Sequence, residues 1–410
     1  MPVFQYFMTY PQALEWLYAR TRSGLPHGSE RGPERAKGLL GQFNNPQRAF
    51  RGVHVLGTNG KGSVCAMISA GLRAAGDRVG RFTSPHLLDF RERITVDGLE
   101  IPESEVVRFV QWAQRDRTEA AFFDLSVVLA FTHFARTGVE VAVVEAGVGG
   151  ARDATVNLEN VLLTVITNVD FDHVETIGPN LAQIALEKAG AIRTGVPVVT
   201  AARGEALEVI RRVALERDAQ LHVFRPEDQF FEEKLFALPR KPALRGVFQL
   251  ENAALAVAGL RLLGLEDGHV EAALEASWPG RMEKFEVQNR AVILDGAHNP
   301  AAARALAASL KPGFALVFGA MARKDVRGLL EPLHELASEV RFVSPGALGS
   351  DPKALALEFE GMAFDSLEQA LHSSLESVPE RGRVLVTGSL YLVAMTRKLL
   401  LELGASPTGD

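Results

Sequence analysis

The chain has 410 residues, a length that favours two or three domains, and 47% of them are hydrophobic while 23% are charged. Such a composition can bury a large core, which excludes collagen-like, low-complexity and wholly disordered proteins. The formal net charge of −6 provides no general basic field and disfavours nucleic-acid binding as the main role. The single cysteine, Cys65, cannot form an intrachain disulfide, as is typical of a reducing compartment.

The N-terminal segment lacks the basic region and apolar core of a secretory signal. The longest apolar stretches, such as 161–169, are strand-length and fall short of the ~20 residues that a membrane-spanning helix needs. We therefore expect a cytoplasmic, enzyme-sized protein without a membrane partner.

Short β-branched runs alternate with stretches of helical period in the first half of the chain. The predicted strands are 53–56, 79–83, 139–145, 161–169 and 196–201, and helical patterns include 63–75 and 181–189. Near-continuous apolar strands that are separated by helices are typical of a parallel sheet with both faces covered. This part of the chain therefore predicts an α/β domain with a mostly parallel sheet.

A polar, proline-containing stretch at 225–247 interrupts the alternation, and a helical run at 252–263 follows it. Trp278-Pro279-Gly280 is typical of a hinge, after which a second α/β series begins. Its predicted strands are 291–294, 314–318, 340–343 and 383–386, and its predicted helices are 300–310, 326–337, 353–360, 367–377 and 391–403. We therefore predict two domains, 1–280 and 281–410, of which the second is a smaller Rossmann-like unit.

The first predicted strand leads into a glycine-rich turn and then a helix. The turn comprises Gly57, Thr58, Asn59, Gly60, Lys61, Gly62 and Ser63. Its backbone N–H groups can converge on phosphate oxygens, and the helix N-terminus adds partial positive charge. Lys61 supplies a point charge for the terminal phosphates, and the hydroxyl of Ser63 can reach Mg²⁺. Val55 occupies the first glycine position of the common GxxxxGK[ST] form, so a strand–helix turn without a ligand is the alternative.

This loop resembles that of the folylpolyglutamate synthase and dihydrofolate synthase family, within the Mur-ligase superfamily. Muramyl ligases usually carry Thr or Ser where Gly62 stands, so the variant indicates the folate branch. Six further segments match that family in order: Ser84-Pro85-His86-Leu87, Glu145-Ala146-Gly147-Val148-Gly149-Gly150, Asp172-His173, Glu187-Lys188-Ala189-Gly190, Asp295-Gly296-Ala297-His298-Asn299-Pro300 and Thr387-Gly388-Ser389-Leu390-Tyr391. The resemblance covers nearly the whole chain and implies a P-loop domain followed by a glutamate-ligase domain.

Three polar residues follow predicted strands of the first domain. Ser84 and Glu145 lie at strand ends, and His173 comes shortly after another strand. Ligands collect at that edge of an open parallel sheet, where these groups could hold a divalent metal. Because Mg²⁺ prefers oxygen ligands, the residues alone favour a structural role for His173. The resemblance implies instead that Ser84, Glu145 and His173 bind Mg²⁺, whereas we expect His86 to be structural.

Lys188 lies in the helical stretch 181–189, where an ordinary lysine, in an i,i+4 pair or facing solvent, is one interpretation. The resemblance implies that carbon dioxide carbamylates this lysine and turns it into an anionic group near the metal. Because that reaction needs an unprotonated amine, burial or nearby cations would have to lower the pKa of Lys188.

The segment 295–300 follows an apolar strand and opens a helix, and capping explains Asn299 and Pro300 but not Asp295 or His298. The resemblance implies that Asp295 contacts the ATP ribose and that His298 serves the phosphate and glutamate region. It further implies that Arg281 contacts the ATP phosphates, that Asn252 contacts the ATP base and that Ser389 contacts glutamate. Arg323-Lys324-Asp325 resembles another active-site segment, with a solvated charge run as the alternative. We expect catalysis to require closure of the domains about Gly280.

Two segments resemble the surroundings of the pterin pocket in bifunctional bacterial enzymes: Phe122-Phe123-Asp124 and Asp153-Ala154-Thr155. Phe123 could stack on a pterin, and Asp153, beside Ala154, could bond its amino-pyrimidine edge. A plain core role for Phe122 and Phe123 is the alternative. The chain departs from the family here, because Arg152 stands where Leu is usual and Val156 separates Thr155 from Asn157.

The resemblance implies an ATP-dependent ligase that works through an acyl phosphate and uses Mg²⁺. We expect it to add L-glutamate both to dihydropteroate and to the glutamate tail of reduced folates, as a monomer, with a monovalent-cation requirement left open. The alternatives are a folylpolyglutamate synthase only, a muramyl-type ligase, or a P-loop regulatory switch. A muramyl-type ligase would need a larger domain ahead of Gly57, and a switch needs neither the segment 295–298 nor a glutamate site.

Overall fold

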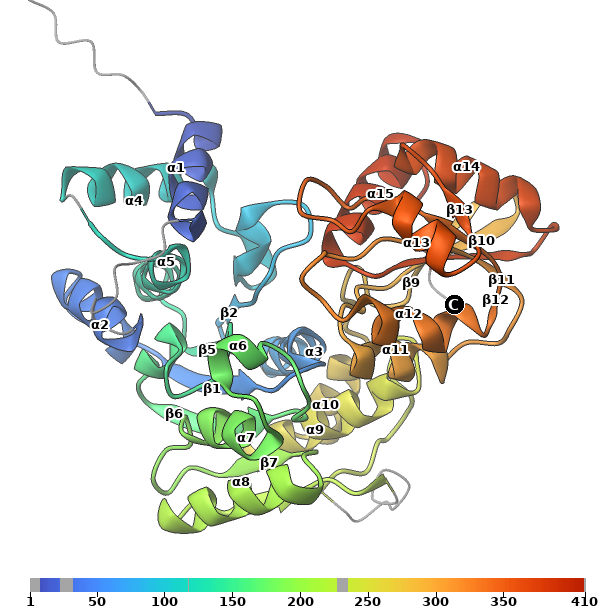
Figure 1. Cartoon of the computed structure of the whole chain (residues 1–410). Helices are drawn as coiled ribbons and strands as arrows, with labels where there is room; N and C mark the ends of the chain where they lie inside the picture. The colour runs from blue at the N-terminus through green and yellow to red at the C-terminus, as the bar shows by residue number, and fades with distance from the viewer. Residues whose placement is uncertain (1–7, 23–31, 117, 227–234, 409–410) are drawn as a thin grey trace, which may run out of the picture. The chain divides into compact units, whose positions relative to one another are not determined.

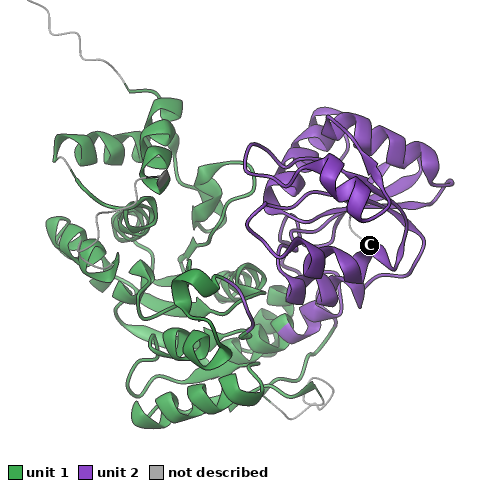
Figure 2. Cartoon of the chain, viewed as in Figure 1, with its two compact units in different colours: residues 1–169, 173–240, 252–274 green, residues 170–172, 241–251, 275–410 purple. Residues whose placement is uncertain are grey.

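The computed structural model describes residues 8–22, 32–116, 118–226 and 235–408 (Figure 1). The chain forms two compact units, neither of which is a single continuous stretch (Figure 2). The first unit contains residues 1–169, 173–240 and 252–274, and the second contains residues 170–172, 241–251 and 275–410. The domain bounds predicted from the sequence, 1–280 and 281–410, stay a prediction.

An eight-stranded sheet forms the centre of the first unit, with the order β4-β3-β2-β5-β1-β6-β7-β8. Its strands are β1 (Arg51–Leu56), β2 (Val79–Phe82), β3 (Ile94–Val96), β4 (Leu99–Glu100), β5 (Val141–Glu145), β6 (Val161–Ile166), β7 (Val198–Thr200) and β8 (Leu221–Val223). The six strands from β2 to β8 in that order run parallel, whereas β3 and β4 pair antiparallel at one edge. The predicted α/β class and mostly parallel sheet are therefore confirmed.

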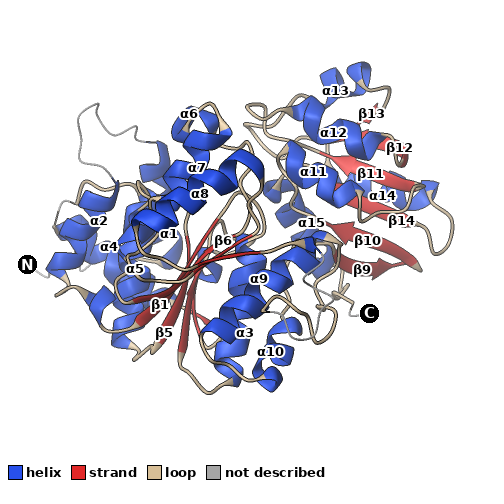
Figure 3. Ribbon diagram, turned by 90° about the horizontal axis from the view of Figure 1, so that it is seen from below, coloured by secondary structure: helices blue, strands red, loops and turns tan. Residues whose placement is uncertain are grey.

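The helices of this unit cover both faces of its sheet. They are α1 (Tyr10–Arg22), α2 (Gly32–Gln42), α3 (Lys61–Ala74), α4 (Glu103–Arg115), α5 (Phe122–Arg136), α6 (Val174–Ile177), α7 (Leu181–Ala189), α8 (Gly204–Glu216), α9 (Phe248–Leu262) and α10 (Asp267–Leu274), with short 3₁₀ turns η1 (Pro46–Arg48), η2 (Phe90–Arg93) and η3 (Ala154–Asn157). Figure 3 shows α7 and α8 on one side of the sheet and α3, α9 and α10 on the other. None of the helices that the structure describes is both long and apolar enough to cross a membrane.

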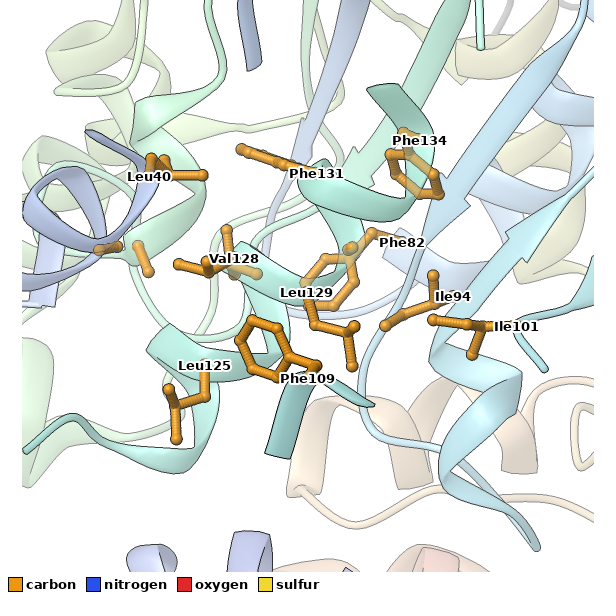
Figure 4. Packing of buried hydrophobic residues seen from close by; sticks show 14 of the residues in the cluster. Leu40, Phe82, Ile94, Ile101, Phe109, Leu125, Val128, Leu129, Phe131 and Phe134 are labelled. Atoms are coloured by element: carbon orange, nitrogen blue, oxygen red, sulfur yellow. The ribbon is translucent and has the colours of Figure 1, made fainter. Parts of the chain in front are cut away.

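The largest apolar core of the first unit surrounds α5, which is apolar on nearly all sides (Figure 4). Phe131 and Phe134 of this helix meet the ring of Phe50 edge-on, with centroids 5.7 and 5.9 Å apart. Burying a large apolar side chain stabilises a fold by roughly 1.5–3 kcal/mol. The core therefore holds α5 firmly, and the first turn of α5 carries Phe123.

The second unit contains a six-stranded sheet with the order β13-β12-β11-β14-β10-β9, parallel except for the antiparallel edge strand β9. Its strands are β9 (Glu283–Val287), β10 (Arg290–Leu294), β11 (Phe314–Phe318), β12 (Ala337–Phe342), β13 (Met362–Ala363) and β14 (Arg383–Thr387). Its helices are α11 (Pro300–Ala307), α12 (Val326–His334), α13 (Pro352–Glu358), α14 (Leu367–Ser377) and α15 (Leu390–Glu402). The predicted helix 326–337 is too long, because Ala337 already pairs with Phe314 in the sheet.

Candidate active site

The glycine-rich turn, here called the phosphate loop (residues 57–63), joins β1 to α3. Gly57 and Gly60 have φ angles of 140° and 84°, which L side chains rarely adopt. A Cβ atom on Gly57 would lie 1.8 Å from Thr167 Oγ1, and one on Gly60 would lie 2.1 Å from Asn252 Oδ1. The loop therefore requires glycine at both positions. The same close approach places Asn252, a predicted ATP contact, directly against the loop.

Residues that follow β6 hold the phosphate loop in place. The amide of Thr58 donates to Asn168 O, and the amide of Asn59 donates to Asn168 Oδ1, both at 2.9 Å. Thr167 Oγ1 donates in turn to Asn59 O at 2.6 Å. Val64 N donates to Gly60 O, so α3 begins directly after the last glycine turn of the loop, at Lys61. The first turn of any helix has backbone N–H groups in excess of its internal acceptors. This arrangement presents N–H groups and partial positive charge to an anion.

Lys61, Ser84 and Glu145 meet beside the loop. Lys61 Nζ lies 3.9 Å from Glu145 Oε1, and Ser84 N donates to Glu145 Oε2 at 3.2 Å. Glu145 and Ser63 are buried, with Ser63 in the first turn of α3. Carboxylate and hydroxyl oxygens, which Glu145, Ser63 and Ser84 carry, are the donors that Mg²⁺ prefers. These residue types fit the predicted metal, and their role as its ligands stays a prediction.

His173 lies on a separate turn, where its φ of 50° precedes α6 and its side chain is exposed. The described parts of the chain contain no group of three or more His, Cys, Asp or Glu side chains that could hold a metal. Two of the four predicted metal ligands, Ser63 and Ser84, are serines and would not form part of such a group. The role of His173 in it stays a prediction.

Lys188 is only 3% exposed, so the solvent-facing interpretation of this lysine is wrong. Its Nζ donates to Gly57 O at 3.0 Å, which brings α7 to the phosphate loop. The preceding residue, Glu187, accepts from Arg152 N at 2.7 Å and from Arg152 Nε at 2.8 Å. Arg152, where the chain departs from the family pattern, therefore points toward α7.

The predicted folate residues lie at the start of α5 and at the start of η3. A Cβ on Gly147 would lie 2.5 Å from Phe123 Cζ, so the ring of Phe123 rests on the backbone there. Asp153 Oδ2 accepts from Val148 N at 2.9 Å, and burial raises the pKa of Asp153. Ala154 is buried next to it. Phe123 and Asp153 thus flank the same backbone segment, 147–148.

Phe122 and Phe123 differ in their surroundings. Phe122 is buried among the rings of Tyr18 and Phe90, at centroid distances of 5.6 and 6.0 Å. Phe123 is only partly buried and contacts the ring of Phe82 at 5.8 Å. The core interpretation therefore applies to Phe122, whereas Phe123 retains exposed surface.

His86, expected to be structural, accepts from Arg93 Nε at 2.7 Å through its Nδ1 atom. Its Nε2 atom lies 3.4 Å from the hydroxyl of Tyr18. Burial lowers the pKa of His86 to about 4, which keeps the ring neutral. These contacts support a structural role.

In the second unit, Asp295 lies at the end of β10 and is buried. Its Oδ2 accepts from Met282 N and its Oδ1 from Ala297 N, both at 2.9 Å. Burial raises the pKa of Asp295, and the charge of Arg281 opposes that shift. A Cβ on Gly296 would lie 2.3 Å from Arg281 Nη1, so this guanidinium packs on the strand end. The structure thus brings Arg281 and Asp295 together.

His298 and Asn299 follow on the same turn. His298 Nδ1 bonds to Gly296 O at 2.9 Å, and burial lowers the pKa of His298 to about 4. Asn299 caps α11 by accepting from Ala302 N and also donates to Asp172 Oδ2 at 3.2 Å. Asp172 belongs to this unit and accepts from Lys324 Nζ at 2.6 Å. Lys324 therefore has an acidic partner, which excludes a freely solvated charge run at this residue.

Ser389 begins α15, where its hydroxyl accepts from Leu392 N at 3.1 Å and the side chain is buried. Capping therefore accounts for the serine at this position. Its predicted contact with glutamate stays a prediction.

Residues that no sequence motif marked hold the phosphate loop and the segment of Asp153 in place. Thr167 and Asn168 fasten the phosphate loop, and His54 contacts the loop that bears Asp153. A histidine within the apolar run Val53–Leu56 was a visible signal of a buried polar contact. Its partner, 101 residues away, could not be read from the chain.

Comparison with known proteins places this geometry in a family. Residues 55–260 match the Mur ligase middle domain, and residues 280–390 match the Mur ligase glutamate ligase domain. A dihydrofolate synthase/folylpolyglutamate synthase from Bacillus subtilis is 34% identical, over 96% of this chain and 100% of the relative.

Solved structures agree over the same extent. The bifunctional folylpolyglutamate synthase/dihydrofolate synthase of Yersinia pestis, complexed with AMPPNP and a manganese ion, has a TM-score of 0.84 and 30% identity, covering 96% of this chain and 98% of that one. Escherichia coli FolC in complex with DHPP and ADP has a TM-score of 0.81 and 28% identity, with the same coverage. The chain therefore belongs to the folylpolyglutamate synthase/dihydrofolate synthase family of the Mur ligase superfamily.

Proposed function

We propose that this protein is an ATP-dependent amide-forming ligase that adds L-glutamate to dihydropteroate and to the glutamate tail of reduced folates. The observation that carries the proposal is the convergence of the phosphate loop, Glu145 and Lys188 at one sheet edge. The relatives' names and their complexes with DHPP, ADP and AMPPNP support the same reaction.

In this reaction the acceptor carboxylate attacks the γ-phosphate of ATP, which gives an acyl phosphate and ADP. The amine of glutamate then attacks the acyl carbon, and phosphate leaves. Two anions must approach each other in the first step, so stabilisation of the developing charge dominates catalysis. Lys61, the amides at the start of α3 and Arg281 supply that positive charge.

Glu145, with the hydroxyls of Ser63 and Ser84 and the imidazole of His173, would hold Mg²⁺. A bound Mg²⁺ supplies Lewis-acid neutralisation of phosphate oxygens. In the second unit, Asp295 would contact the ribose of ATP, and His298 and Ser389 would bind glutamate. Asn252 would contact the base of ATP.

Lys188 is proposed to carry a carbamate. Its amine is buried and hydrogen-bonds to the phosphate loop, so a carboxylated Lys188 would place an anion beside the nucleotide site. Carbon dioxide would supply the group, and deprotonation of the amine would precede the attack. A monomeric state and a cytoplasmic location complete the proposal.

A folylpolyglutamate synthase without dihydrofolate synthase activity is the second candidate. It is favoured by the departure at Arg152, whose side chain bonds to Glu187 beside the loop proposed to contact the pterin.

One experiment separates the two candidates. Purified protein is supplied with Mg-ATP, L-glutamate and either dihydropteroate or a reduced folate, and the products are identified by mass spectrometry. Glutamylation of both acceptors supports the bifunctional enzyme, and glutamylation of reduced folate alone supports the second candidate. Failure with both acceptors contradicts the proposed function.

A further inference from the structure

His54 is a buried polar residue in the strand that leads to the phosphate loop. It lies three residues before Gly57 in β1, is 0% exposed, and pairs with Val144 and Thr164 on the neighbouring strands. Buried polar groups usually have a hydrogen-bond partner because an unmade bond is costly. The partner of His54 therefore indicates what this residue holds in place.

That partner is the hydroxyl of Thr155, 3.0 Å from His54 Nε2. The hydroxyl donates its hydrogen to Asp153 Oδ1 at 2.5 Å, and Thr155 N donates to the same oxygen at 2.9 Å. Since a hydroxyl has one hydrogen, His54 Nε2 must be the donor in the first bond. His54 Nδ1 has no hydrogen-bond partner among the described atoms.

The chain of donors therefore runs from His54 through Thr155 to the carboxylate of Asp153. Burial lowers the pKa of His54 to about 3, so the ring is neutral and Nδ1 is its unprotonated nitrogen. Arg193 also holds this turn, because it donates to the carbonyls of Val156 and Leu158. Val156 lies within η3, which directly follows Asp153.

We propose that His54 is a positioning residue for the acceptor substrate, which acts by fixing the hydroxyl of Thr155 and hence the carboxylate of Asp153. The inference rests on the proposed function, because it takes Asp153 as a contact to the acceptor. Removal of the link leaves Asp153 held by the amides of Val148 and Thr155 but without a fixed hydroxyl, which weakens binding of the acceptor. The phosphate loop has its own contacts to Thr167 and Asn168 and keeps its affinity for ATP.

The test compares variants that keep or remove the link. His54→Leu and Thr155→Val remove it, whereas His54→Gln and Thr155→Ser keep a donor or hydroxyl near the original position. Thr164→Val is the matched control, because Thr164 is buried beside His54 and its hydroxyl has no hydrogen-bond partner among the described atoms.

We expect His54→Leu and Thr155→Val each to raise KM for dihydropteroate or reduced folate about tenfold, while KM for Mg-ATP changes by less than about twofold. The double variant should be no worse than the poorer single variant, since both remove the same link. His54→Gln, Thr155→Ser and Thr164→Val should stay within about twofold of the wild type.

A calorimetric titration of each variant with the acceptor and Mg-ADP measures binding without turnover and should show the same tenfold loss. Equal changes in both KM values, additive effects in the double variant, or an unchanged acceptor affinity would overturn the inference. Wild-type protein that glutamylates neither acceptor overturns the proposed function instead, so the two failures are distinguishable. If one of the two variants that remove the link does not fold, the acceptor affinity of the other, compared with that of Thr164→Val, decides.

Discussion

The two strand-end clusters, one in each unit, hold their charged groups in different ways. At the phosphate loop, Lys61 lies 3.9 Å from Glu145, which is too long for a hydrogen bond and leaves both groups able to meet a ligand. In the second unit, both oxygens of Asp295 accept from backbone amides, and Asn299 and Ser389 cap helices. In the first cluster, Lys61 and Glu145 are not hydrogen-bonded to each other. In the second cluster, the polar side chains also stabilise turns and helix ends through hydrogen bonds to the backbone. Substitution of Lys61 should therefore separate activity from stability, whereas substitutions in the second cluster should couple them.

The largest effect is expected at Lys61. Lys61→Met should lower kcat/KM at least about 100-fold, because it removes the positive charge on the transferring phosphate. Its contacts within the protein are weak, a 3.3 Å bond to Thr58 O and the distant Glu145, so the melting temperature should hardly change. Steady-state kinetics and thermal unfolding on the same sample measure both quantities. A collapse of stability would contradict the comparison.

Lys188→Ala should lower activity about 10- to 100-fold and also destabilise the first unit, since Gly57 O loses its buried partner. The proposed carbamate adds a second readout: wild-type protein kept free of carbon dioxide should lose activity and regain it with bicarbonate. The alanine variant should not respond to bicarbonate. Full activity of Lys188→Ala would show that this lysine has no catalytic role.

In the second unit, Asp295→Asn should lower activity about tenfold and the free energy of unfolding by about 1–3 kcal/mol, because one backbone amide loses its acceptor. Asn299→Ala is the matched substitution on the same turn and should cost about 1 kcal/mol through the lost cap. Denaturant unfolding and kinetics give both values. If Asp295→Asn lowers activity but not the free energy of unfolding, the proposed difference between the two clusters is wrong.

The pH dependence of stability tests the protonation state of His54. His54 has a folded-state pKa of about 3, below the value of about 6.5 in an unfolded chain, so the unfolded state binds a proton first as the pH falls. Its contribution to the free energy of unfolding is present above pH 6.5 and decreases by about 1.4 kcal/mol per pH unit below it. Between pH 7.5 and 5, wild-type protein should lose about 2 kcal/mol more than His54→Gln. Parallel curves for the two proteins would contradict the neutral, buried histidine.

The sequence predicted those parts of the fold whose signal is local. Strand β11 and helices α7 and α14 begin and end at the predicted residues, because apolar runs and helical periods define them. Helix α5 was not predicted, since a helix that is buried on nearly all sides shows no amphipathic period. The antiparallel pair β3 and β4 was missed because both strands are very short.

The same limit applies to the candidate site. The residues of the phosphate loop and the buried Lys188 follow from motifs that are contiguous in the chain. The link from His54 to Thr155 joins residues 101 positions apart, and no local pattern encodes such a pair. The sequence could flag the histidine as unusual in its strand but could not name its partner or the loop that it holds.

The most direct test of the proposed ligase is the substrate dependence of ADP release. Purified protein with Mg-ATP should form ADP at a sustained rate only when both a pteroate or folate acceptor and L-glutamate are present, with one ADP for each amide bond formed. Omission of either substrate should abolish steady turnover. The same rate of ADP formation without acceptor and glutamate would contradict the ligase assignment.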